Sequence, residues 1–261
     1  MGNTPTFSND AERFNWLERP DDDFPFYRGQ PVWLSTGAWL LVLLAVALGF
    51  LELLYGPGLV SAGPARFVVV FLYVAMPLAV LSLVAGQHWR ALFRPIRAID
   101  FLWMIGFAIL NLLVTLVTGT IMTRLIETTA NKAVAGASQL AGSDLLLFFA
   151  QTGVQLVGEE VMSILPFLAL MYWLCGRGGM RRKRAIIVAA LIVAALFAVE
   201  HLPTYNWNLL QALLGVGVAR IVLLLPYIMT KSLAVSAGAH ILNDWMFFGV
   251  SILGSAMAAT K

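Results

Sequence analysis

The sequence predicts an all-α fold: a polytopic membrane bundle of about seven to eight transmembrane helices. Of the 261 residues, 60% are hydrophobic and only 12% are charged, and the mean hydropathy is +0.83. A soluble domain carries about one quarter charged residues. The apolar runs are each near the ~20 residues that a helix needs to cross a bilayer, about twice the length of a barrel strand. Composition and run length therefore both indicate helices that span a membrane.

Seven apolar runs are the expected spans, and they are separated by short polar segments. They cover Val32–Tyr55, Ala65–Gly86, Ile99–Met122, Ser143–Leu174, Arg184–His201, Leu209–Thr230 and Ser232–Ala256. The stretch at 123–142 is polar and rich in small residues, so we expect a loop there, with room for a surface helix. An eighth span hidden in this stretch would reverse the orientation of the C-terminal half.

Basic residues gather in alternate connections, which predicts the orientation by the positive-inside rule. The segment before the first span, the connection between spans two and three, and the connection between spans four and five carry Arg13, Arg19, Arg28, Arg90, Arg94, Arg97, Arg177, Arg181, Arg182, Lys183 and Arg184. The other connections are poor in basic residues. We therefore expect a cytoplasmic N-terminal segment at 1–31 and a transmembrane domain at 32–261 whose C-terminus lies outside.

Three further features narrow the class of protein. The net charge is only +3 and the basic residues lie at span ends, so the basic pI of about 9.2 reflects topology and not nucleic-acid binding. The single cysteine, Cys175, excludes an internal disulfide and is expected to be a small buried residue. The acidic first thirty residues lack the features of a secretory signal.

The fourth span carries two adjacent glutamates, Glu159 and Glu160, in the stretch "QLVGEEVMSILPFL". Ionised carboxylates cost several kcal/mol at the centre of a bilayer, so they are rare there and usually functional. Glu159 shares one helix face with Thr152, Gln155 and Ser163, whereas Glu160 points about 100° away. This polar face is expected to line the bundle interior or a water-filled cavity.

Two later spans place histidines on polar faces. The fifth span ends in "ALFAVEH", with Phe197 and His201 four residues apart. In the seventh span, "SLAVSAGAHILNDW" sets Ser236, His240 and Asp244 four residues apart, with Asn243 alongside. The third histidine, His88, lies in a basic connection. Polar faces at these positions are expected to meet inside the bundle.

Each of these groups also has a structural interpretation. A lone histidine or asparagine inside a membrane often joins helices through a hydrogen bond of about 1 kcal/mol. A glutamate near a helix end can extend to the interface. Two carboxylates, two histidines and an Asn-Asp pair on three spans, however, are the set of groups needed to activate water. Helix association alone does not require that combination.

These motifs resemble the CPBP family, the CAAX protease and bacteriocin-processing enzymes, also called the Abi family, which includes the type II CAAX prenyl endopeptidases. The resemblance rests on Glu-Glu, then Phe-three-His, then His-three-Asn/Asp on successive late spans, within about 151–248. It places a protease-like core at about 143–256. Two departures stand out: Ile164 occupies the arginine position of the first motif, and Asp244 replaces the commoner asparagine of the third.

The resemblance implies an intramembrane endopeptidase that acts on a membrane-associated protein or peptide. Glu159 is expected to take a proton from a water shared with His201, while His240 with Asp244 or Asn243 stabilises the oxyanion. Glu160 is expected to orient a partner helix or to share a proton with Glu159. A zinc version with His201, His240 and Glu159 as candidate ligands stays open, although we favour a mechanism without a cofactor.

Other functions remain as alternatives at this point. A transporter or proton relay also needs polar groups at the midplane, although we find no internal repeat. A non-catalytic scaffold, or an immunity protein with a protease-like fold, is open because Ile164 replaces the arginine. The family acts on prenylated proteins in eukaryotes and on other substrates in bacteria, and we expect a bacterial inner-membrane protein. The sequence gives no oligomeric state.

Arg220 stands in the middle of the sixth span, in "GVGVARIVLLLP". An unpaired arginine is costly at this depth, and its reach of roughly 6–7 Å is short for the interface. We expect it to pair with Glu160, so that another helix supplies the positive charge that Ile164 removes from the first motif. We also expect Glu159, His201 and His240 to surround one water-accessible cavity.

Overall fold

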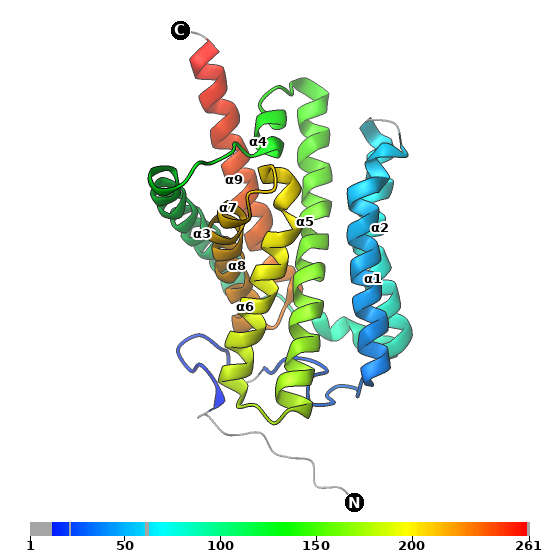
Figure 1. The fold of residues 1–261 in the computed structure, drawn as a ribbon. Coiled ribbons are helices and arrows are strands. Elements are labelled where there is room, and N and C mark those ends of the chain that lie inside the picture. The colour runs from blue at the N-terminus through cyan, green and yellow to red at the C-terminus, as the bar shows by residue number, and fades with distance from the viewer. Residues whose placement is uncertain (1–11, 21, 61–62, 260–261) are drawn as a thin grey trace, which may run out of the picture.

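The fold is a bundle of long helices, and a computed structural model describes it for residues 12–20, 22–60 and 63–259 (Figure 1). Within these residues the chain forms α-helices, 3₁₀ turns and π turns, and it forms no strand. The all-α fold class predicted from the sequence is confirmed.

The first half of the bundle consists of three long helices and a short one. These are α1 (Thr36–Tyr55), α2 (Arg66–Ala85), α3 (Ala98–Leu125) and α4 (Lys132–Ala137), with the 3₁₀ turns η2 (Gly56–Gly58), η3 (Gly63–Ala65) and η4 (Gly86–Leu92) between them. The short helix α4 lies in the predicted polar loop. Its first turn is fixed by Asn131, whose side-chain oxygen accepts hydrogen bonds from the backbone N–H groups of Ala133 and Val134.

The second half carries the polar motifs. It comprises α5 (Gly142–Met171), the π turn η5 (Tyr172–Arg177), α6 (Arg182–Glu200), the 3₁₀ turn η6 (Leu202–Tyr205), α7 (Leu209–Gln211), the π turn η7 (Ala212–Gly217), α8 (Val218–Thr230) and α9 (Leu233–Ala259). The elements α7, η7 and α8 follow one another without a break and together fill the predicted sixth span.

All seven predicted spans are helical. In the described part of the chain, five helical stretches are long and apolar enough to cross a membrane: Thr36–Gly58, Gly63–Leu92, Ala98–Leu125, Gly142–Arg177 and Leu209–Thr230. The other two predicted spans, α6 and α9, are also long helices, but α6 begins with three basic residues and α9 carries the His-Asn-Asp face. The protein is therefore an integral membrane protein with several spans.

Helix α5 is the centre of the bundle and contacts α1, α2, α6 and α9. In its most apolar window 72% of the residues are buried, against 22–28% for the first three spans, whose outer faces carry many exposed leucines. A largely apolar helix that is buried on most sides is typical of the core of a membrane bundle. This position brings both glutamates of α5 into the interior.

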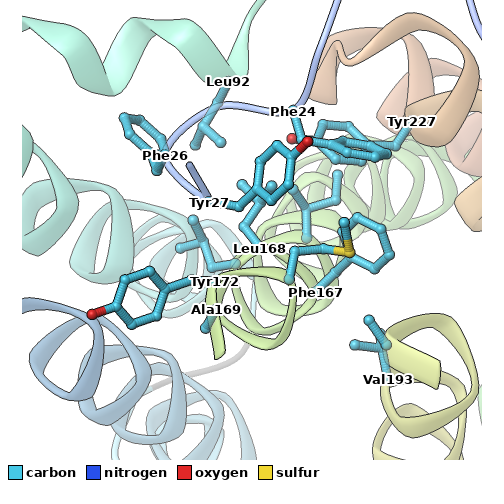
Figure 2. Close-up of a cluster of buried hydrophobic side chains, with 14 of the residues drawn as sticks. Phe24, Phe26, Tyr27, Leu92, Phe167, Leu168, Ala169, Tyr172, Val193 and Tyr227 are labelled. Atoms are coloured by element: carbon cyan, nitrogen blue, oxygen red, sulfur yellow. The ribbon is translucent and has the colours of Figure 1, made fainter. Parts of the chain in front are cut away.

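Residues 12–20 and 22–31 of the N-terminal segment pack against one end of the bundle, where the α2–α3 and α5–α6 connections also lie (Figure 1). Phe24, Phe26 and Tyr27 are almost completely buried, and Figure 2 shows Phe24 beside Tyr227 and Phe26 near Leu92. These rings join the main hydrophobic core. The polar, acidic composition of the segment did not predict this burial.

A buried ion-pair network fastens the same segment. The guanidinium of Arg182 donates to both carboxylate oxygens of Glu18, at 2.7 and 2.6 Å, and Lys231 Nζ donates to Glu18 Oε2 at 2.8 Å. Burial alone raises the pKa of the Glu18 carboxyl, but these hydrogen bonds and positive charges outweigh burial and lower the pKa from 4.5 to about 2. The segment thus connects the start of α6 to the turn between α8 and α9.

Candidate active site

A cavity of about 290 Å³ lies between α3, α5, α8 and α9 and the C-terminal end of α6. Five of the predicted site residues line it: Glu159, His201, His240, Asn243 and Asp244. Arg220 lines it as well, together with the polar residues Asn111, Thr115, Thr118, Thr129, Asn131, Tyr205 and Gln211. The three polar faces of α5, α6 and α9 therefore meet around one space.

The two adjacent glutamates of α5 point to different surroundings. Glu159 faces the cavity, and its Oε1 accepts a hydrogen bond from Gln155 Nε2 at 2.9 Å, one turn earlier. Glu160 is completely buried and does not line the cavity. The helical rotation of about 100° between neighbouring residues produces this division.

Glu160 is surrounded by three polar partners. Arg220 Nη1 lies 2.6 Å from Glu160 Oε1, His240 Nδ1 lies 2.8 Å from the same oxygen, and the hydroxyl of Ser236 donates to Oε2. The side chains of Glu160 and Arg220 are both fully buried. Glu160 therefore links α5 to α8 and α9, and it holds the ring of His240 in place.

His240 stands between the buried and the cavity-facing carboxylates. Because Nδ1 faces Glu160, Nε2 points into the cavity, 3.9 Å from Glu159 Oε2 and 3.7 Å from Asp244 Oδ1. These two distances are too long for direct hydrogen bonds. They are short enough for one water molecule to bond to both the imidazole and a carboxylate.

The Asn-Asp pair of α9 is tied to α3. Asn243 Nδ2 donates to Asp244 Oδ1 at 2.8 Å, and Asn243 Oδ1 accepts from Asn111 Nδ2 at 3.1 Å. These two bonds fix the orientation of the Asn243 amide, and its second N–H has no hydrogen bond among the residues that the structure describes. Asn111 is buried in α3, and it was not among the predicted site residues.

His201 is the C-cap residue that follows α6, and it is half-buried at the cavity wall. Its Nδ1 lies 2.8 Å from the carbonyl oxygen of Phe197, one turn earlier. This contact assigns the N–H to Nδ1 and leaves Nε2 as an acceptor. The ring lies 4.5 Å, centroid to centroid, from the ring of Phe197, and the two rings are tilted by 41°. The ring of Phe197 also lies under the guanidinium of Arg220.

Ser163 and Ile164, the two last positions of the first motif, are both buried but lie in different surroundings. Ser163, on the face of Glu159, is buried, and its hydroxyl has no hydrogen-bond partner among the described residues. Ile164 is completely buried in the main hydrophobic core. The position at which the motif carries arginine is therefore apolar here, and the guanidinium near Glu160 comes from α8.

Glu200 is a further carboxylate near the cavity, and it was not among the predicted site residues. It precedes His201, and it interacts electrostatically with Glu159 and Arg220. It also lines an apolar groove between α1, α5 and α6 with Phe50, Pro166 and other side chains. Glu200 could have been selected from its position at the end of a predicted span, because a carboxylate within a membrane span is costly and is usually functional.

The zinc alternative requires three or more ligands around one point. Within residues 12–20, 22–60 and 63–259, no group of three or more His, Cys, Asp or Glu side chains is placed to hold a metal ion. His201, His240 and Glu159 thus share the cavity without forming such a group. In the mechanism that we propose, these side chains act on water directly and not through a metal ion.

The comparisons with known proteins identify the segment that carries these motifs. Residues 141–246 match the family described as Rce1-like, type II CAAX prenyl endopeptidase Rce1-like. The match spans α5 to the middle of α9 and includes Glu159, Glu160, His201, His240 and Asp244. It confirms the family resemblance that the motifs indicated. No curated protein and no solved structure matches the chain.

Proposed function

Because residues 141–246 match the Rce1-like type II CAAX prenyl endopeptidase family, we propose that this protein is an intramembrane endopeptidase that activates water with Glu159. The observation that carries the proposal is the facing pair in the cavity: Glu159 Oε2 and His240 Nε2, 3.9 Å apart. A water that bonds to both groups is held between a base and a hydrogen-bond donor, as hydrolysis requires.

Glu159 is the proposed general base. Gln155 occupies its Oε1, so Oε2 is the oxygen that faces the cavity. Glu159 takes one proton from the water, and the oxygen of that water attacks the carbonyl carbon of the peptide bond. His201, with Nε2 as an acceptor, orients the second hydrogen of the same water.

His240 and Asn243 are the proposed oxyanion donors. His240 Nδ1–H donates to Glu160. In the protonated ring Nε2–H holds the water before the substrate binds, and it then donates to the carbonyl oxygen of the bound substrate, which becomes negative during attack. The second N–H of Asn243 is a further donor. Breakdown of the tetrahedral intermediate expels the amine, which receives the proton that Glu159 took from water, so protons balance over the cycle.

Glu160, Arg220 and Asp244 are proposed to position the reacting groups. Glu160 holds Nδ1 of His240, and Arg220 balances the negative charge of Glu160 inside the bundle. Asp244 accepts from Asn243 and fixes that amide. The substrate is a membrane-associated protein or peptide, and the family description makes a C-terminally prenylated peptide the first one to test.

Cleavage by purified protein tests the proposal. The full chain in liposomes is incubated with a fluorescent farnesylated peptide that ends in a CAAX sequence, and the released tripeptide is measured. Glu159→Gln keeps the shape of the side chain but removes the base, so we expect kcat to fall about 10²–10⁴-fold.

Glu127→Gln is the matched control, because Glu127 is exposed in the loop after α3 and its substitution should leave the rate unchanged. Equal rates for Glu159→Gln and the wild type would remove Glu159 from the mechanism. Absence of cleavage in both proteins over a panel of prenylated and unmodified membrane peptides would argue for a non-catalytic role.

A further inference from the structure

The cavity that holds the proposed catalytic groups also follows one face of α3. Asn111, Thr115, Thr118, Gly119 and Met122 of this helix all line it. Their spacings of three and four residues place them on one helix face. All five precede residues 141–246, the segment that matches the family. The family match therefore assigns no role to this wall of the cavity.

The α3 wall leads from the catalytic groups to the connections at one end of the bundle. At its start, Asn111 Nδ2 donates to Asn243 Oδ1 at 3.1 Å, beside the proposed oxyanion donors. Beyond its far end, Thr129 and Asn131 in the connection after α3 line the same cavity. Figure 1 shows that α4, which follows this connection, lies at the end of the bundle away from the N-terminal segment. About 12 Å of helix rise separates Asn111 from Gly119, which equals the length of about three to four residues of an extended peptide.

Two polar side chains on the α3 wall have hydrogen-bonding capacity that the described part of the chain does not use. Asn111 is buried, and its Oδ1 has no hydrogen-bond partner among the described residues. The carboxylate of Asp244 fixes the Asn243 amide, which makes Nδ2 of Asn111 the donor between the two amides and leaves Oδ1 as an acceptor. The hydroxyl of Thr115 likewise makes no hydrogen bond to a described residue. A peptide backbone offers an N–H and a C=O at each residue, which suit an amide oxygen and a hydroxyl.

Gly119 leaves room within the α3 wall. A Cβ added there would meet no other atom within 4 Å, whereas a Cβ at Gly158 would overlap the ring of Tyr73. Close packing therefore does not require a glycine at 119, and helix propensity favours almost any other residue. The consequence of the glycine that remains is a wider cavity at this level of the helix.

We propose that the α3 wall binds the substrate backbone in an extended conformation, on one side of the scissile bond, and that Gly119 sets the size of the side chain accepted there. This inference rests on the proposed function, because the catalytic pair defines where the scissile bond lies. Asn111 Oδ1 accepts from a backbone N–H of the peptide, and the Thr115 hydroxyl donates to a backbone C=O. The peptide reaches the catalytic pair from the end of the bundle that carries Thr129 and Asn131.

Peptide binding by variants of the full chain tests the α3 wall. The parent protein carries Glu159→Gln to prevent turnover, and each variant adds one substitution to it. Proteins in nanodiscs are titrated into fluorescein-labelled peptide, with empty nanodiscs as the background. The probes are the farnesylated CAAX peptide of the cleavage assay and its unfarnesylated form. Gly119→Leu should raise the Kd at least about tenfold, because the leucine fills the space that the peptide needs.

Gly106→Leu is the matched control for this substitution. Gly106 lies on α3 outside the cavity lining, and its Cβ position is equally open, so the Kd should not change. Peptides in which glycine replaces one residue at a time provide a second readout. One of them should bind Gly119→Leu as well as it binds the parent protein. A purely structural effect of the leucine would not depend on the peptide sequence.

Thr115→Val tests the polar contact of the α3 wall. Valine keeps the shape of threonine but removes the hydroxyl, so the Kd should rise about two- to tenfold, as for the loss of one hydrogen bond. Thr120→Val is the control, since Thr120 is exposed and its hydroxyl bonds to the carbonyl of Leu116 at 2.7 Å. Equal Kd values for these two variants would remove Thr115 from the peptide site.

The outcomes separate this inference from the proposed function. Equal Kd values for Gly119→Leu and Gly106→Leu, or a loss in Gly119→Leu that no glycine-containing peptide relieves, would overturn the inference and leave the proposed function intact. Absence of peptide binding to the parent protein would overturn both. Unfolding midpoints are measured in parallel. A midpoint that falls for Gly119→Leu alone would contradict the open space on which the inference depends.

Discussion

Glu160 and Arg220 show how single residues are constrained inside this bundle. Both side chains are fully buried, and their charged atoms lie 2.6 Å apart. None of the three guanidinium nitrogens of Arg220 makes a hydrogen bond of good geometry among the described residues. The attraction of opposite charges therefore carries most of this contact, and removal of either partner leaves a buried charge uncompensated.

A double-mutant cycle measures this coupling. We expect Glu160→Gln and Arg220→Gln each to lower the free energy of unfolding by about 3–5 kcal/mol. The double variant should lose less than the sum, by roughly 0.5–3 kcal/mol. Unfolding in mixed micelles gives the free energies, and Arg124→Gln, an exposed charge at the end of α3, is the control. Strictly additive losses would mean that the two residues act independently.

Metal removal separates the two mechanisms that the site residues allow. In the proposed mechanism the wild-type protein should keep its cleavage rate after incubation with a strong chelator, because Glu159 and His240 act on water directly. The rate before and after dialysis, and after addition of Zn²⁺, is the measurement. A loss with chelator that Zn²⁺ reverses would instead make His201, His240 and Glu159 ligands.

Helix packing decides where the polar faces meet. Helix α2 approaches α5 at Gly158, beside Glu159: a Cβ added to Gly158 would overlap the ring of Tyr73. The hydroxyl of Tyr73 donates to Met162 Sδ at 3.1 Å and holds the ring in the same groove. A glycine here lets α2 pack closely on the helix that carries the proposed base.

Gly158→Ala should therefore displace α2 from α5. Small-to-large changes in a packed core cost about 1–3 kcal/mol, and the shift should also lower the cleavage rate because Glu159 is the next residue. Gly106→Ala is the matched control, since Gly106 lies in α3 with open space at the Cβ position. That variant should be neutral or slightly stabilising, owing to the helix propensity of alanine. Equal unfolding midpoints for the two variants would contradict this account of the packing.

At the scale of the whole molecule, the N-terminal segment connects helices that are far apart in the chain. Glu18 bonds to Arg182 at the start of α6 and to Lys231 between α8 and α9. Phe24 stacks on Tyr227 of α8 and meets Phe167 of α5 edge to face. The segment therefore holds together the helices that carry His201, Arg220 and His240.

This network predicts how stability responds to acid. The folded-state pKa of Glu18, about 2, lies below its ordinary value of 4.5, so its stabilisation is complete above pH 4.5. It is lost as pH falls from about 4.5 to about 2, because the unfolded chain takes up the proton first. We expect the free energy of unfolding of Glu18→Gln to be lower than that of wild type at neutral pH. The difference between the two should shrink over that range.

Unfolding of both proteins across this pH range is the measurement. Glu127→Gln, which changes an exposed carboxylate, should follow the wild type throughout. A difference between Glu18→Gln and wild type that is constant with pH would show that Glu18 contributes by packing and not by its charge.

The sequence by itself determined the membrane class, the positions of the seven helices and the resemblance of the segment that carries the motifs to the Rce1-like family. A long apolar run forms a helix in lipid, because there every backbone N–H and C=O must be paired within the segment itself. Run ends therefore fell within a few residues of helix ends, as for Leu209–Thr230. The motif spacings were also enough to predict which polar residues share a helix face, because residues i and i+4 of a helix lie on the same face whatever surrounds the helix.

The tertiary structure decided most of the partners that the polar groups meet. The sequence placed Glu160 off the face of Glu159 and led us to expect its pairing with Arg220, but the packing of α8 and α9 against α5 also brought Ser236 and His240 to the same carboxylate. The burial of Phe24, Phe26 and Glu18 also depends on surfaces that only the assembled bundle provides. Periodicity reports the direction of a side chain relative to its own helix, whereas the neighbours on the other side follow from how the helices pack. This is why the residue types of the site could be predicted while their hydrogen bonds could not.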